Sequence, residues 1–130
     1  KSNLYVVDTK TDAVKKKFDI EASTFTIDKD FAYIISTAWS NVTMSTVVSY
    51  SKINVKDETV VAGGFIKDGS EKDIVMPYGI AVDPISSDIY LTDAKDYVSP
   101  GALYCFDKTG KKKFSVVTGD VPAHLVFYTK

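Results

Sequence analysis

Two stretches of the chain, LYVVDTKTDAVKKKF (residues 4–18) and LYCFDKTGKKKF (residues 103–114), repeat one pattern. Each begins with aromatic and β-branched residues, continues with an aspartate and a Lys/Thr turn, and ends with three lysines and a phenylalanine. That pattern predicts a β-hairpin in both places. A second segment recurs as well, because PYGIAVD (residues 77–83) is similar to PAHLVFY (residues 122–128) and, more loosely, to ASTFTID (residues 22–28). The chain is therefore predicted to consist of repeated units.

Each complete unit contains four candidate strands, separated by turns rich in Gly, Pro, Asp and Ser. The strands are predicted at residues 25–28, 32–36, 46–53 and 59–65, and again at 79–83, 89–92, 102–107 and 113–118. Two further strands, at residues 4–8 and 14–20, precede these units, and one, at residues 125–128, follows them. No helical periodicity competes with this pattern.

Units of four antiparallel strands that repeat about every 40 to 50 residues indicate an all-β fold of the β-propeller type. The chain supplies a partial set of about two and three-quarter four-stranded blades, whereas a closed propeller has four to eight. We therefore expect one domain, residues 1–130, divided into blades 1–21, 22–76 and 77–121 and a closing strand 122–130. This domain is expected to be the carboxy-terminal part of a longer propeller or to be completed by another chain.

Charge and composition exclude several functions. The net charge is −1 and all sixteen basic residues are lysines, so a nucleic-acid or phosphate-binding role is not expected. The lysine runs at residues 15–17 and 111–113 begin the outermost strand of a blade, where lysine protects an exposed edge. The single cysteine, Cys105, excludes an intrachain disulfide and is expected to be a small buried apolar group. No apolar stretch is long enough for a direct membrane span.

The loops on one face of the predicted propeller, residues 37–45, 66–76, 93–101 and 119–123, are the candidate ligand-binding region. Trp39 is the only tryptophan and lies in the polar stretch STAWSNVT, where an exposed indole serves as a ligand anchor or packs locally within the loop. Asn41 belongs to the same stretch. Tyr97 and Asp96 lie in the corresponding loop of the next blade. Trp39 and Tyr97 are predicted to form a platform for a large planar ligand, unless Tyr97 instead caps the adjacent blade.

Tyr78 and His124 lie at the expected mouth of the first strands, near the central channel. His124 is the only histidine, and neither a second histidine nor a suitably spaced carboxylate accompanies it, so we expect it to fill the channel. Four aspartates that could suggest calcium do not match an EF-hand and are common turn residues; they are Asp83, Asp88, Asp93 and Asp96. We assign no metal, no cofactor and no catalytic residue, because no nucleophile motif or paired catalytic carboxylates are present.

The stretch MPYGIAVDPISSDIYLTDA, followed by ALYCFDKTGKKKFSVVTGDVPAHLVFY, resembles the YVTN-type β-propeller repeat. In that repeat a Pro-x-Gly-apolar strand precedes a strand of the form (V/I)Y(V/L)T(N/D). The sequence is most similar to YncE-like surface propellers of Bacteroides-type bacteria, which often end in GD-x-PAH, and the resemblance covers about the last 60 residues well. It implies about seven blades and an exported protein of the cell surface or periplasm, lipid-anchored through an upstream segment.

The same resemblance, to surface cobalamin-binding lipoproteins, implies capture of cobalamin or a related corrinoid for a TonB-dependent outer-membrane transporter. We therefore expect a non-catalytic propeller that binds a ligand or a protein partner on its loop face. Two alternatives stay open. One is a protein–protein interaction scaffold, and the other is a propeller enzyme whose catalytic residues lie in further blades.

Overall fold

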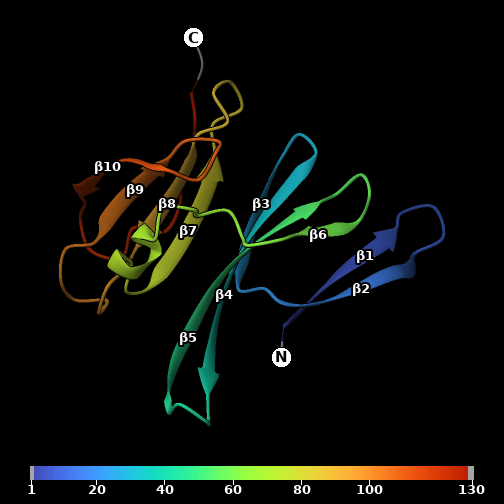
Figure 1. The fold of residues 1–130 in the computed structure, drawn as a ribbon, viewed down its shortest axis with the longest axis horizontal. Coiled ribbons are helices and arrows are strands. Elements are labelled where there is room, and N and C mark those ends of the chain that lie inside the picture. The colour runs from blue at the N-terminus through green and yellow to red at the C-terminus, as the bar shows by residue number, and fades with distance from the viewer. Residues whose placement is uncertain (1, 129–130) are drawn as a thin grey trace.

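The computed structural model describes residues 2–128, and the chain in this range is all-β. Figure 1 shows the strands in three groups that follow one another across the molecule in chain order. The first is a hairpin of β1 (Asn3–Asp8) and β2 (Ala13–Glu21). The second sheet has the order β3 (Thr24–Asp28), β4 (Phe31–Ser40), β5 (Ser45–Asn54) and β6 (Thr59–Val61). The third has the order β7 (Pro77–Val82), β8 (Ile89–Asp93), β9 (Ala102–Phe106) and β10 (Lys112–Val117).

All neighbouring strands in these sheets are antiparallel, which confirms the predicted repeat of four-stranded units. Within residues 2–128 the one helix is a short 3₁₀ turn, η1 (Ser70–Asp73). The described sheets do not close into a ring. No helix in the described range is long and apolar enough to cross a bilayer.

The strand predicted at residues 125–128 is wrong, because residues 122–128 form no strand. This segment lies against a face of the third sheet instead of along an edge. The carbonyl oxygen of Ala123 lies over Gly79 of β7, and the Phe127 ring packs against Tyr90 of β8 with centroids 5.3 Å apart. A segment on a sheet face meets side chains and finds no partner strand for its backbone. Thr129 and Lys130, the last residues of the predicted closing strand, lie outside the described range.

The second and third sheets pack face to face over the main hydrophobic core. Ile35 of β4 and Leu91 of β8 are fully buried there, together with Phe106 of β9. Phe65, from the connection between the sheets, contacts Tyr33 and Tyr50 edge-to-face, with both pairs of ring centroids 5.6 Å apart. The alternation of apolar residues along β4 and β8 thus directs one face of each sheet toward the other.

The first hairpin covers the opposite face of the second sheet. Phe18 of β2 packs with Ile34 of β4 and Ile53 of β5 in a smaller core. Lys15 forms an ion pair with Glu58, in the turn between β5 and β6, so a lysine of the predicted edge run also joins the two sheets. Every described sheet therefore packs against a neighbour.

The connection between β6 and β7, residues 62–76, contacts both sheets that it joins. The Lys67 amide donates to the Gly110 carbonyl at 2.9 Å, and the Tyr104 hydroxyl donates to the Asp73 carbonyl at 3.0 Å. Gly110 has a φ of 90°, and a Cβ there would lie 2.1 Å from the Phe65 carbonyl oxygen. Only glycine permits this close approach of the connection to the β9–β10 turn.

Candidate functional site

Three of the residues predicted to bind a ligand line one cavity of about 540 Å³ beside the start of β7. These are Tyr78 of β7, Tyr97 of the β8–β9 loop and His124 of the carboxy-terminal segment. We call it the tyrosine cavity; its other lining residues are Ser23, Thr24, Phe25, Thr37, Met76, Pro77, Gly79, Ile80, Ala123 and Leu125. The side chains of Tyr78 and Tyr97 are both partly exposed and meet edge-to-face, with ring centroids 5.8 Å apart.

Tyr78 owes its position to an irregularity at the start of β7. The pairing of β7 with β8 shifts register between Pro77 and Ile80. Within this bulge the Gly79 amide donates to the Thr92 hydroxyl at 2.8 Å. A Cβ on Gly79 would lie 2.1 Å from the Ala123 carbonyl oxygen, so glycine lets the segment that carries His124 approach β7. The Pro-Tyr-Gly sequence therefore brings Tyr78 and His124 to the same cavity.

Asp93, at the end of β8, fixes the strand and the loop that carry the two tyrosines. Its fully buried carboxylate accepts hydrogen bonds from the backbone amides of Val75 at 3.1 Å, Met76 at 2.8 Å and Lys95 at 2.9 Å. It thereby ties the residues before β7 to the β8–β9 loop. Sequence reasoning treated Asp93 as a turn residue and missed this role. The available signal was an aspartate directly after the apolar run IYLT.

Asp96 shapes the β8–β9 loop and does not face the cavity lining. Its carboxylate accepts from the Ser99 amide at 2.7 Å, the Ser99 hydroxyl at 2.8 Å and the Val98 amide at 3.1 Å. These hydrogen bonds, the one from the Ser99 amide foremost, lower the pKa of Asp96 to about 2. Tyr97 itself is held at a φ of 66°, a left-handed conformation that is unusual for tyrosine. We therefore assign Asp96 to loop geometry, beside the predicted site and not within it.

The tyrosine cavity has few titratable groups in its described lining. Among its described lining residues, His124 and the two tyrosines are the only titratable side chains. His124 is exposed, and no carboxylate lines the cavity to orient its imidazole. The arrangement offers two aromatic rings, an imidazole and a few hydroxyls, which suits the binding of an uncharged or ring-containing molecule.

The loop predicted for residues 37–45 is shorter in the structure, so Trp39 lies on a strand whereas Asn41 lies in the turn. The structure corrects this prediction, because β4 and β5 stay paired as far as Ser40 and Ser45, and the turn occupies residues 41–44. Trp39 is thus a strand residue with 62% of its surface exposed. Asn41 lies exposed in the turn and lines neither this cavity nor the next one described.

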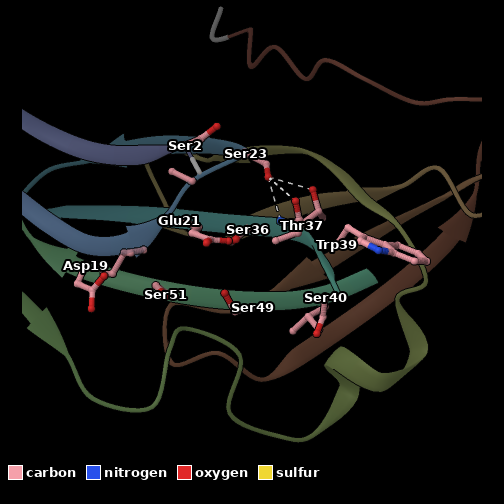
Figure 2. Close-up of a pocket in the computed structure, with 14 residues that line it drawn as sticks. Ser2, Asp19, Glu21, Ser23, Ser36, Thr37, Trp39, Ser40, Ser49 and Ser51 are labelled. Atoms are coloured by element: carbon pink, nitrogen blue, oxygen red, sulfur yellow. Dashed lines mark hydrogen bonds between the residues drawn. The ribbon is translucent and has the colours of Figure 1, made fainter. Parts of the chain in front are cut away.

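Trp39 lines a second, larger cavity of about 720 Å³ between the first hairpin and β4–β5 (Figure 2). We call it the serine cavity; it is lined by Ser2, Asp19, Ile20, Glu21, Ala22, Ser23, Ser36, Thr37, Ala38, Trp39, Ser40, Val47, Ser49 and Ser51. The structure does not bring Trp39 and Tyr97 to one cavity: Trp39 lines the serine cavity, whereas Tyr97 lines the tyrosine cavity and packs on Tyr78.

Ser23 and Thr37 line both cavities and separate them. The Ser23 hydroxyl accepts from the Thr37 amide at 2.9 Å, lies 3.0 Å from the Thr37 hydroxyl and donates to the Thr37 carbonyl at 3.2 Å. These contacts, drawn as dashed lines in Figure 2, join the residue before β3 to β4. The two candidate sites are thus neighbours that share one wall.

The remaining aspartates that were weighed as calcium ligands have other partners. Asp83 accepts from the Ile85 amide at 2.9 Å and the Ser86 hydroxyl at 2.8 Å, and Asp88 pairs with Lys113 at 2.6 Å. Within residues 2–128 no group of three or more His, Cys, Asp or Glu side chains is arranged to hold a metal ion. Their carboxylates stabilise turns and join strands.

Comparison with known proteins adds no family to this description. No protein-family model matches the chain, and no curated protein is significantly similar to it.

Proposed function

We propose that this chain is part of a β-propeller whose tyrosine cavity binds a ligand without transforming it. The observation that carries the proposal is the convergence of Tyr78, Tyr97 and His124 on one cavity of about 540 Å³. Cavities of this size accommodate small organic molecules, and aromatic side chains supply much of the contact area in such sites. The two four-stranded sheets, packed face to face, support the propeller architecture.

In its most specific form, the proposal is that the ligand is cobalamin or a related corrinoid and that the protein passes it to a TonB-dependent outer-membrane transporter. The support is the YVTN-like repeat together with the aromatic lining of the cavity. A corrin macrocycle has an extended apolar face that the Tyr78 and Tyr97 rings would contact. In this proposal the protein is exported and acts at the cell surface or in the periplasm.

The test is calorimetric titration of the protein with cyanocobalamin, using Tyr97→Ala and Tyr78→Ala as variants. We expect each variant to weaken binding about tenfold, because each removes an aromatic ring from the lining. Val98→Ala is the matched control, because Val98 is a neighbouring exposed loop residue that does not line the cavity. Absence of binding heat would rule out a corrinoid as the ligand. Equal affinity of the wild type and all variants would rule out the tyrosine cavity as the binding site.

A protein–protein interaction scaffold is the second candidate, and a separate observation favours it. An apolar hollow of about 310 Å³ lies between the first hairpin and the second sheet, lined by residues that include Val6, Phe25 and Ile27. Phe25 and Ile27 are at least half exposed. Exposed apolar surface of this kind is typical of interfaces. Ile27→Ser with Val55→Ser would abolish binding of a protein partner and leave cyanocobalamin binding unchanged, because both residues line the hollow and neither lines the tyrosine cavity.

A further inference from the structure

The serine cavity is a polar site that the proposed function does not use. Seven of its fourteen lining residues carry hydroxyl groups. Three of these hydroxyls lie close together on β4 and β5. Ser36 of β4 is paired with Ser49 of β5, and Ser51 lies two residues further along β5. Residues two apart on a strand project to the same side, so Ser49 and Ser51 present their hydroxyls in one row.

The hydroxyls of Ser36, Ser49 and Ser51 have no hydrogen-bond partner among residues 2–128. Ser36 is 6% exposed, yet no hydrogen bond in the described part of the chain involves its side chain. The side chains of Ser49, which is exposed, and of Ser51, which is partly buried, likewise make no hydrogen bond within the described part of the chain. Each of these hydroxyls can therefore exchange hydrogen bonds with water or with a molecule bound in the cavity. The row therefore offers hydrogen-bond donors and acceptors to a ligand.

The charges around the cavity select the class of ligand. The charged side chains among the described lining residues are carboxylates, and that of Asp19 disfavours an anion such as a phosphate. The described lining also lacks the three or more clustered ligands that a metal ion needs. A neutral molecule with many hydroxyl groups fits best, because it can donate to the Asp19 carboxylate and exchange hydrogen bonds with serines.

Trp39 adds an apolar surface at the edge of this polar cavity. In Figure 2 its indole lies toward one end of the labelled residues, and Asp19 lies toward the other. The C–H face of a pyranose ring is apolar, whereas its rim carries hydroxyls, so a flat indole next to serines and carboxylates matches both parts of a sugar. We propose that the serine cavity binds a neutral saccharide, independently of the ligand in the tyrosine cavity.

The fluorescence of Trp39 tests this directly, because it is the only tryptophan in the 130 residues. The probes are maltohexaose, cellohexaose, xylohexaose and chitohexaose, each added to about 10 mM, with calorimetry as a second readout. We expect a saturable change in Trp39 emission with at least one of the four. Absence of a saturable signal in both readouts with all four probes would overturn the proposal.

Substitutions in the serine cavity then test whether the saccharide binds there. Ser49→Val and Ser51→Val each remove one hydroxyl from a strand that tolerates valine, and we expect each to weaken binding about fivefold. Ser115→Val is the control, because Ser115 is an exposed strand serine on β10 that does not line the cavity. Unchanged affinity in the Ser49→Val/Ser51→Val double variant, or loss of binding on Tyr97→Ala, would overturn the assignment to the serine cavity.

Discussion

The two four-stranded sheets have the same strand order, yet their second and third strands are joined in different ways. In the second sheet Ile27 pairs with Ala32, and in the third Val82 pairs with Ile89, so Ser36 of β4 occupies the position of Asp93 in β8. After Ser36 the two strands continue as a paired ribbon to Ser40 and Ser45. After Asp93 the chain leaves the sheet and forms the loop that carries Tyr97.

The difference shows how one buried carboxylate changes a connection. Asp93 accepts hydrogen bonds from the Val75, Met76 and Lys95 amides, so the residues after β8 are held against the entry to β7. The Ser36 side chain makes no such contacts among the described residues, and β4 and β5 satisfy their backbone groups by pairing with each other. The residue at this position thus distinguishes the third sheet, where a compact loop carries Tyr97, from the second sheet, where the strands continue as an extended ribbon.

The largest effect is expected for Asp93→Ser, which gives β8 the residue found at the equivalent position of β4. Three amides would lose a buried charged acceptor, so we expect a loss of about 3 kcal/mol in the free energy of unfolding. Urea denaturation measures it. The control is Asp83→Ser, whose carboxylate serves an exposed turn. A loss below about 1 kcal/mol would show that Asp93 does not fix the loop.

Next in size is Gly79→Ala, at the point where the third sheet receives the carboxy-terminal segment. The added Cβ would clash with the Ala123 carbonyl oxygen, so the segment has to move away, at an expected cost of about 2 kcal/mol. The same variant should make the bond after His124 accessible to limited proteolysis. Gly119→Ala is the matched control, because nothing lies within 4 Å of its Cβ. Equal stability of the two variants would contradict the observed packing.

A smaller change in stability, of opposite sign, is expected at two tyrosines of the core that the second and third sheets share. The Tyr50 hydroxyl of the second sheet is buried without a hydrogen-bond partner, and its burial raises its pKa above the ordinary value. The Tyr104 hydroxyl of the third sheet donates to Asp73. We expect Tyr50→Phe to stabilise the protein by about 1 kcal/mol and Tyr104→Phe to destabilise it by about as much. Thermal unfolding of the two variants should therefore shift in opposite directions, and shifts in the same direction would refute this account.

The smallest effect concerns acid stability of the β8–β9 loop. Because the pKa of Asp96 in the folded protein is about 2, below its ordinary value, its ionised form stabilises the fold above about pH 4. That contribution is lost as the pH falls through about 2. The difference in urea midpoint between the wild type and Asp96→Ala should therefore narrow between about pH 4 and pH 2. A constant difference would show that the Asp96 hydrogen bonds do not stabilise the loop.

The sequence predicted all ten described strands, because alternating apolar residues and Gly, Pro and Asp turns are local signals, although β6 ends at Val61 and not at the predicted residue 65. It failed at residues 37–40, where Ser, Thr and Trp resemble a loop in composition but pair across a ribbon. The repeat placed Tyr78 and His124 together near the expected channel mouth, but it paired Tyr97 with Trp39 and did not predict the contact of Tyr97 with Tyr78. The bonds of Asp93, and the wall formed by Ser23 and Thr37, depend on distances between elements that no local pattern encodes.

The way the connection between β6 and β7 packs has a consequence for dividing the chain into modules. Phe65 lies between Tyr33 and Tyr50 of the preceding sheet, while its carbonyl oxygen lies against Gly110 of the following one. A chain that ends before Phe65 would lack the ring that packs on Tyr33 and Tyr50 of the second sheet. A chain that begins after Phe65 would lack the backbone that contacts the β9–β10 turn of the third sheet. We therefore expect neither sheet to keep its packing when it is produced without the other.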